Sequence, residues 1–123
     1  MERTEDRGMK LAGEADRLRI YSGENDKVGG RLVFEVVVEQ ARKAGLAGAT
    51  VLRGLSGFGA NSRVHTATIL RLSEDLPVVI EIVDRPEKID SFLPLLDQIL
   101  GEGMVTRDRV DVLFYRHKDG KKA

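Results

Sequence analysis

The residues best suited to chemistry lie in one segment of the chain, RGLSGFGANSRVHTATILR, which runs from Arg53 to Arg71. It contains three arginines and a histidine but no aspartate or glutamate, although acidic and basic residues are equally frequent in the chain as a whole. Its glycines let main-chain N–H groups approach a ligand closely and form an anion-binding nest, and arginines bind phosphate or carboxylate. The segment therefore predicts an anion site. The alternative is a solvated hairpin loop whose arginines pair with acids such as Glu74 and Asp75.

Residues that could catalyse a reaction are few. The chain has no cysteine, which excludes thiolate chemistry and cysteine-based metal sites. Of its two histidines, His117 lies near the C-terminus, which leaves His65 as the imidazole of the folded part. A lone histidine outside any HExxH-like spacing favours a hydrogen-bonding or ligand-contact role over that of a general base. We therefore expect no catalytic residue and no enzyme activity.

Three acidic residues have positions that could serve a function. Glu24 and Asp26 could hold Mg²⁺ beside a phosphate, although a solvated acidic turn has the same composition. Glu81 lies among apolar residues, where active sites place acids and bases. We favour for it an ion pair with Arg19 or Arg53 across a subunit contact.

Length and charge limit the class of protein. The chain has 123 residues, the size of one domain, and its 20 basic residues balance 20 acidic ones. This balance argues against a surface built to bind nucleic acid. No apolar run approaches the roughly 20 residues that span a bilayer, and the charged N-terminus lacks the apolar core of a signal peptide. We expect a cytoplasmic protein that binds no nucleic acid and does not insert into the membrane.

We divide the chain into a mobile N-terminal tail (residues 1–15), a folded domain (16–116) and a basic C-terminal tail (117–123). Alternating or continuous apolar residues predict four strands in the domain. These are Arg17–Ser22, Gly48–Ser56, Leu76–Asp84 and Arg109–Arg116. The third is nearly continuous in apolar residues, so we expect it at the centre of the sheet.

The first of two predicted helices covers residues 31–45, RLVFEVVVEQARKAG. Its valines favour a strand, but its apolar spacings of three and four residues, its length and the glycine at its end favour a helix.

The second helix is predicted to begin at Asp84 and Glu87, which have the spacing of a capping box, with Pro86 in the first turn. Pro94 is expected to bend this helix or to end its first half. Its apolar stripe consists of Ile89, Phe92, Leu93, Leu96, Ile99 and Leu100.

The predicted order, β-α-β-β-α-β, is the ferredoxin-like split-βαβ pattern. We therefore expect an α+β domain with a four-stranded antiparallel sheet and both helices on one face. The long loop 53–71 lies between the second and third strands. The open face of such a sheet is available for association.

Several motifs resemble those of a known family. GFG at Gly57–Gly59 and HT at His65–Thr66 are similar to the entrance of the T-loop in PII signalling proteins. More closely, the stretches GLAGATVLRGLSGFG, HTATILRLSEDLPVVIEIVD, EKI, FLPLLD and EGMVT resemble the PII-like family called domain of unknown function 190. The resemblance covers about Leu18–Tyr115, and motifs of this length are very specific.

The resemblance implies a ferredoxin-like protomer that forms a homotrimer and binds a nucleotide between neighbouring subunits. The phosphates would meet the loop glycines, and the loop would report occupancy to a partner, a membrane transporter or an enzyme. In place of the glycine- and lysine-containing phosphate loop of PII proteins the chain has GEGMVTRDRVD. There Gly101 and Gly103 could bend around a ligand, whereas Glu102 and Asp108 disfavour a polyphosphate.

We therefore interpret the chain as a PII-like signalling protein that binds a small anionic ligand, an adenine nucleotide (AMP, ADP or ATP). The expected ligand-binding residues are Arg53, Gly57, Phe58, Gly59, Arg63, His65, Thr66, Gly101 and Gly103. Two alternatives stay open at this point. One is a metal-dependent phosphoester hydrolase that uses Glu24 and Asp26, and the other is a ligand-free protein-interaction scaffold.

Overall fold

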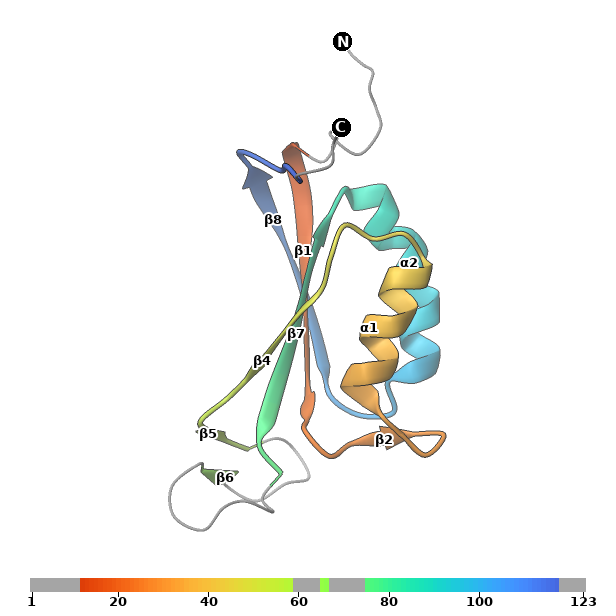
Figure 1. Ribbon diagram of the computed structural model, residues 1–123, viewed down its shortest axis with the longest axis vertical. Helices are drawn as coiled ribbons and strands as arrows, with labels where there is room; N and C mark the ends of the chain where they lie inside the picture. Colours follow the sequence, from red (N-terminus) through yellow and green to blue (C-terminus); the bar gives the residue numbers. More distant parts are fainter. Residues whose placement is uncertain (1–11, 59–64, 67–74, 118–123) are drawn as a thin grey trace.

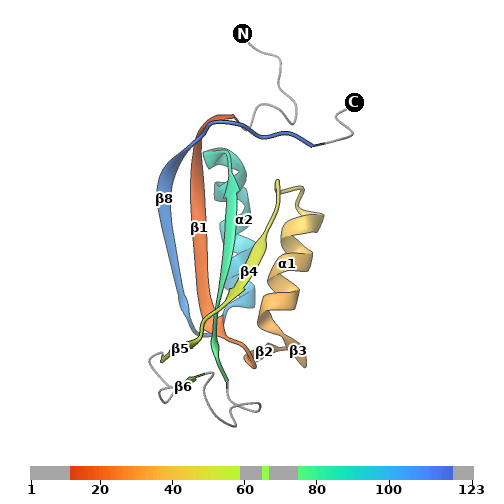
Figure 2. The same cartoon turned by 60° about the vertical axis from the view of Figure 1, so that its left-hand side comes forward.

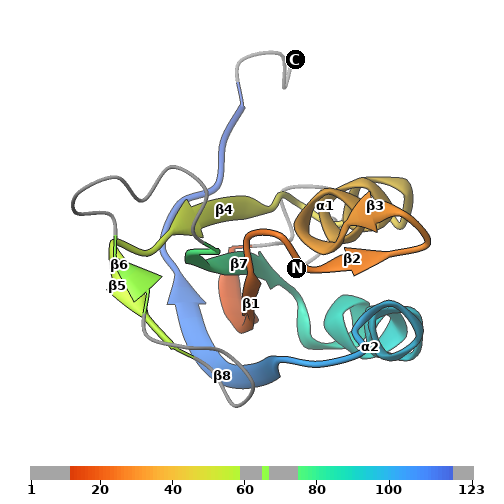
Figure 3. The same ribbon diagram turned by 90° about the horizontal axis from the view of Figure 1, so that it is seen from below.

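A computed structural model describes residues 12–58, 65–66 and 75–117 of the chain. Its centre is a four-stranded antiparallel sheet in the order β4-β7-β1-β8. The strands are β1 (Gly13–Gly23), β4 (Thr50–Arg53), β7 (Pro77–Asp84) and β8 (Met104–Val112). Both helices, α1 (Val33–Lys43) and α2 (Pro86–Ile99), cover one face of the sheet and leave the other open (Figures 1 and 3). The predicted α+β ferredoxin-like class is confirmed, with β7 and β1 at the centre.

Two short ribbons extend from the sheet. The first pairs β2 (Lys27–Val28) with β3 (Arg31–Leu32), and the second pairs β5 (Ser56–Gly57) with β6 (His65–Thr66). The strand predicted over Gly48–Ser56 is therefore too long. Its main-sheet part ends at Arg53, where pairing with β7 ends, and Ser56 belongs to the second ribbon.

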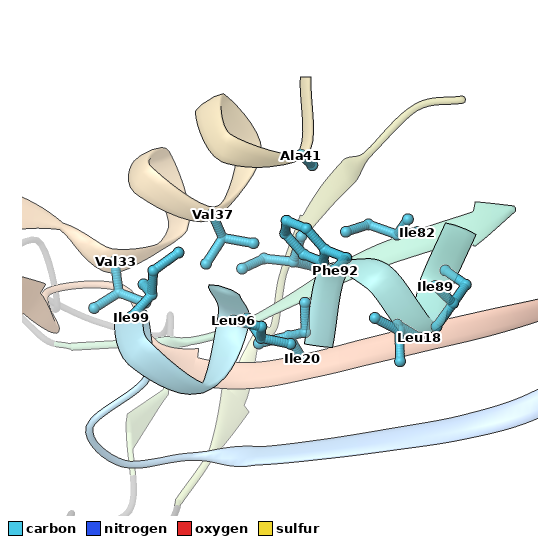
Figure 4. Packing of buried hydrophobic residues seen from close by; sticks show 11 residues of the cluster. Leu18, Ile20, Val33, Val37, Ala41, Ile82, Ile89, Phe92, Leu96 and Ile99 are labelled. Carbon is cyan, nitrogen blue, oxygen red and sulfur yellow. The ribbon is translucent and has the colours of Figure 1, made fainter. Parts of the chain in front are cut away.

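The core lies between the helices and the helix-facing side of β1 and β7. Side chains alternate between the two faces of a strand, so one residue in two points toward the helices. The buried cluster consists of Leu18, Ile20, Val33, Val37, Ala41, Ile80, Ile82, Ile89, Phe92, Leu96 and Ile99 (Figure 4). The apolar stripe predicted for the second helix is confirmed. Four of its members are in this cluster, and Leu93 and Leu100 pack against it.

The valine-rich segment forms a helix because one face of it is buried. Val33, Val37 and Ala41 follow one another at intervals of four residues and are the buried residues of α1. Beyond the helix, Gly45 has a φ of 79° and its N–H donates to the carbonyl of Arg42. The N–H of the next residue reaches the carbonyl of Ala41, which completes a Schellman motif. The predicted helix and its glycine stop are confirmed, but the helix begins at Val33, because Arg31 and Leu32 form β3.

The capping box predicted at the start of α2 is wrong. Arg85 is the N-cap, and no side chain caps the helix. The carboxylate of Asp84 is buried and accepts hydrogen bonds from the N–H groups of Ala47 (2.8 Å) and Arg85 (2.7 Å). Asp84 therefore anchors the α1–β4 connection. Pro86 takes the first helical position as expected, and α2 does not end at Pro94.

The last strand begins and ends earlier than predicted. The prediction was Arg109–Arg116, whereas β8 is Met104–Val112 and pairs with β1 along its whole length. Residues 113–117, which we name the C-terminal strap, cross the end of the sheet from β8 toward β4 (Figure 2). The Tyr115 hydroxyl donates to the carbonyl oxygen of Ala47 at 3.2 Å and fastens the strap there.

Candidate functional site

One end of the sheet gathers most of the residues predicted to bind a ligand. Strand pairing places Gly23 opposite Pro77 and Arg53 opposite Val78, while β8 begins opposite Tyr21. The end of β1, the end of β4 and the starts of β7 and β8 therefore lie together. We call this region the loop end of the sheet, and the β5–β6 ribbon lies beside it (Figure 1).

Arg53, the last residue of β4, forms an ion pair with Glu24 at the loop end. Its Nη2 group donates to Oε2 of Glu24, and this hydrogen bond, aided by charge attraction, raises the pKa of the guanidinium. The N–H of Glu24 is itself held by the carbonyl of Leu76 at 2.7 Å. The Arg53 side chain is 61% exposed, so a ligand can reach it but must compete with Glu24.

Two glycines of the predicted nest pack closely against Pro77. The N–H of Gly54 donates to the carbonyl oxygen of Pro77 at 2.7 Å. A Cβ atom would lie 2.9 Å from Pro77 Cγ if placed on Gly54 and 3.2 Å if placed on Gly57. The close approach of two backbone segments is one reason for glycine at these positions. Sequence reasoning missed Pro77 as the surface against which the loop base packs.

The remaining loop residues are placed in part. Phe58 is 72% exposed, an unusual position for a large apolar side chain. His65 and Thr66 form β6, and their backbones pair with Gly57 and Ser56. The predicted ligand residues Gly59 and Arg63 lie outside the described residues.

Gly101 and Gly103 lie in the turn between α2 and β8, also at the loop end. Gly103 has a φ of 129°, and a Cβ atom on it would be 2.4 Å from the carbonyl oxygen of Tyr21. No atom lies close to the corresponding position on Gly101. Gly103 is thus required by the local backbone.

Gly54, which follows β4, and Gly103, which precedes β8, lie at opposite edges of the sheet, because the strand order puts β4 at one edge and β8 at the other. Neighbouring strands are about 4.8 Å apart, so three strand spacings separate the edges by about 14 Å. Within one chain, Gly54 and Gly103 are therefore too far apart to hold the same phosphate group.

The candidate metal ligands have other partners. Asp26 accepts a hydrogen bond from the N–H of Gly23 at 2.9 Å, and Glu24 pairs with an arginine as described above. Nearby, the carboxylate of Asp75 accepts a hydrogen bond from the N–H of Asn25 at 2.7 Å. Across the part of the chain that the structure describes, no group of three or more His, Cys, Asp and Glu residues is arranged to hold a metal ion. The magnesium site stays a prediction.

The open face of the sheet carries two ion pairs within the chain. Arg19 and Glu81 lie opposite each other on β1 and β7 and are 3.0 Å apart. The predicted ion pair between Glu81 and Arg19 is confirmed, and it joins two neighbouring strands of one chain. Arg17 pairs with Asp108 at 2.7 Å, which raises the pKa of the arginine and lowers that of the carboxyl group. Asp108 is a strand residue neutralised by Arg17, and its charge opposes a bound anion less than the sequence suggested.

A buried carboxylate that the sequence analysis did not single out joins β1 to β8. Asp16 accepts hydrogen bonds from Nε of Arg107 and Nε of Arg109, both at 2.6 Å. The bond from Arg109 contributes most to lowering the pKa of Asp16. Arg107 also pairs with Asp90 of α2 at 2.8 Å. The sequence around Asp16 gives no sign of this role, because Arg107 and Arg109 lie far from Asp16 in the chain.

The fold is that of PII-like proteins. The structure is similar to that of CPII, a nitrogen regulatory PII-like protein from Thiomonas intermedia K12 bound to ADP, AMP and bicarbonate, with a TM-score of 0.55 and 19% sequence identity over 80% of this chain and 88% of that one. CPII bound to ADP and bicarbonate matches with a TM-score of 0.52 and 20% identity over the same shares of the chains.

The chain belongs to the DUF190 family (Uncharacterized ACR), whose sequence model matches residues 15–112. A UPF0166 protein of Aquifex aeolicus is 35% identical over 99 residues, covering 79% of this chain and 91% of the relative. A UPF0166 protein of Methanocaldococcus jannaschii is 39% identical over 87 residues, which cover 71% of this chain and 80% of the relative. The resemblance to this family is thus confirmed. Neither α1 nor α2, the helices of the described residues, has the length and apolar composition needed to cross a bilayer.

Proposed function

We propose that the protein is a non-enzymatic PII-like regulator. It assembles as a homotrimer, binds a small anionic ligand between subunits and signals the bound state through loop 53–71. The ligand is an adenine nucleotide, and the regulated partner is a membrane transporter or an enzyme. The PII-like fold and membership of the DUF190 family support the regulatory class.

One observation carries the proposal of a site between subunits. The start of the loop at Gly54 and the turn with Gly103 lie at the same end of the sheet but at opposite edges. The edge strands of a single chain hold Gly54 and Gly103 apart, whereas a neighbouring copy can place its β8 edge beside the β4 edge of the first. Association of copies therefore completes the site.

Charge and the solved neighbours support an anionic ligand. Arg53 is an exposed cation at the loop base, and the loop that follows it, through Arg71, contains no acidic residue. Arginine binds phosphate and carboxylate groups through charge-assisted hydrogen bonds. CPII, which shares the fold, is found with ADP, AMP and bicarbonate, all of which are anions. AMP, ADP and ATP are the candidates to be compared.

The ion pair at the loop base supports a signalling mechanism. A ligand that takes the guanidinium of Arg53 must displace the carboxylate of Glu24, which belongs to the turn after β1. Binding would thereby loosen the contact between the loop base and that turn. The ligand shifts the equilibrium only to the extent that it binds one arrangement better than the other.

Native mass spectrometry of the full chain tests the proposal. We expect a trimer that takes up three molecules of one nucleotide when titrated with AMP, ADP, ATP and cyclic AMP. A trimer that binds none of them would favour the scaffold alternative. A monomer with one nucleotide per chain would contradict the intersubunit site.

The hydrolase alternative has less support, because Glu24 and Asp26 already bond to the protein itself. Incubation of the nucleotide with the protein and Mg²⁺ distinguishes the two functions. We expect the nucleotide to stay intact. Steady turnover that is lost in Glu24→Ala would establish the hydrolase and overturn our proposal.

A further inference from the structure

A cavity of about 290 Å³ lies on the open face, at the end of the sheet away from the loop end. Thr50 at the start of β4 and Glu81 on β7 lie opposite each other in register and line it. The apolar side chains of Val83 and Val112 form further parts of its wall. The cavity is therefore separate from the candidate nucleotide site and belongs to different residues.

The C-terminal strap gives the cavity its remaining wall. The strap leaves β8 after Val112 and crosses toward β4, where the hydroxyl of Tyr115 bonds to the carbonyl of Ala47. Tyr115 and Ala47 both line the cavity. The hydrogen bond holds these two walls together, so the cavity is part of the folded domain.

Two polar groups that line the cavity, the carboxylate of Glu81 and the hydroxyl of Thr50, can accept a hydrogen bond from a ligand. One oxygen of Glu81, Oε2, accepts a hydrogen bond from Nε of Arg19 at 3.0 Å. Within the described residues, its other oxygen and the hydroxyl of Thr50 have no hydrogen-bond partner. Because the Glu81 side chain is only 29% exposed, a ligand that donates a hydrogen bond there would be partly shielded from water.

An ammonium group suits this arrangement. It carries a positive charge and three donors, enough to bond the free Glu81 oxygen and the Thr50 hydroxyl together. Hydrogen bonds between charged groups are stronger than neutral ones. The volume is close to the lower limit of ligand pockets, about 300 Å³, and suits a molecule smaller than a nucleotide.

We propose that this cavity binds a small aliphatic primary amine, whose ammonium group bonds to Glu81 and Thr50 and whose hydrocarbon body packs against Val83 and Val112. The site is independent of the proposed nucleotide site. Two sources supply this chemistry, a free amine or a lysine of the chain's own C-terminal residues, which include Lys118, Lys121 and Lys122.

The test is a titration of the full chain with 3-methylbutan-1-amine, followed by amide NMR shifts, with 3-methylbutan-1-ol as the uncharged control ligand. We expect saturable shifts at Gly48, Thr50 and Glu81 with the amine, and binding of the alcohol to be about tenfold weaker. Glu81→Gln and, as a second variant at an exposed position, Thr50→Val should each weaken amine binding. Glu39→Gln breaks the ion pair between Glu39 and Arg31, neither of which lines the cavity, and should leave the affinity unchanged.

Equal binding of the amine and the alcohol, shifts confined to other residues, or unchanged affinity in both Glu81→Gln and Thr50→Val would overturn the proposal. A full chain with Lys118, Lys121 and Lys122 all changed to glutamine separates the two sources. Tighter amine binding in that variant identifies a tail lysine as the occupant. Unchanged binding identifies a free amine. Either result supports ammonium recognition by the cavity.

Discussion

Arg53 and Glu24 form an ion pair that joins the last residue of β4 to the turn after β1. Since β7 lies between these two strands, the pair reaches across three strands at the loop end. It fastens the first residue of the acid-free segment to a turn that is itself bonded to Leu76. The arginine predicted to bind a ligand is thus already oriented by a carboxylate.

The first prediction concerns this pair. If Arg53 contacts the nucleotide, Arg53→Gln should weaken binding about tenfold, since a charge-assisted hydrogen bond is lost. Glu24→Gln should strengthen binding several-fold, because it removes the competing carboxylate. Isothermal titration calorimetry measures both affinities. Arg85→Gln, which removes an exposed arginine at the other end of β7, is the control and should bind like the wild type. Equal affinities in all four proteins would place Arg53 outside the site.

The second prediction concerns the turn between α2 and β8. Gly103→Ala should destabilise the fold by at least about 2 kcal/mol, because the backbone is in a region that favours glycine and the new Cβ would meet the carbonyl of Tyr21. Gly101→Ala adds its methyl group in open space and should cost less than about 0.5 kcal/mol. Urea unfolding gives both values. If both variants lose a similar amount of unfolding free energy, the turn rearranges to accept a side chain at Gly103.

The third prediction concerns acid. Hydrogen bonds from Arg109, Arg17 and Arg31 are the main causes that lower the pKa values of Asp16, Asp108 and Glu39 below their ordinary values of 3.8, 3.8 and 4.5. Groups with a lowered folded-state pKa stabilise the fold fully above their unfolded pKa, and this contribution is lost as the pH falls through the folded pKa. Stability should therefore hold from pH 7 to about pH 5 and fall below about pH 4.

Asp16→Asn tests this dependence at the most buried of the three carboxyl groups. The variant should be less stable than the wild type at pH 7 and should lose less stability below pH 4. Urea midpoints measured from pH 7 to pH 2.5 give the comparison. Asp97→Asn is the control, because Asp97 is exposed and has no ion pair among the described residues. It should follow the wild-type curve. If the urea midpoint of Asp16→Asn falls with pH as steeply as that of the wild type, the acid sensitivity comes from other groups.

The fourth prediction separates packing from binding. Phe92 is 1% exposed within the core, so Phe92→Ala should cost about 3–5 kcal/mol in the free energy of unfolding. Phe58 is 72% exposed, and Phe58→Ala should change stability by less than about 0.5 kcal/mol. The same variant should weaken nucleotide binding in calorimetry. A large stability loss in Phe58→Ala would show that this side chain packs against the protein.

Local patterns predicted the elements with one buried face. The apolar stripe from Ile89 to Ile99 and the alternation in β1 follow directly from helix and strand periods, and β7 was predicted from its nearly continuous apolar run. Pro94 lies between the buried residues Phe92 and Leu96, and their packing keeps α2 continuous through it. Tertiary contacts here outweigh a local preference.

The errors have nonlocal causes. The start of β8 was misjudged because Arg107 is a charged strand residue whose partner, Asp16, is far away in the sequence. Asp84 has the spacing of a capping box, but its carboxylate is used by Ala47 instead. Arg53 is a ligand residue only by prediction, and its ion-pair partner Glu24 was predicted only as a metal ligand.

The pairing of Gly13 with Val112 places the start of β1 and the end of β8 side by side, at the end of the sheet away from Arg53. The first strand therefore begins and the last strand ends at the same pole of the folded domain, and the loop end forms the opposite pole. A reporter domain or a surface linker fused at either terminus would be attached at the first pole. Immobilised in this way, the protein would present its loop end outward, a convenient orientation for sensing experiments on a chip.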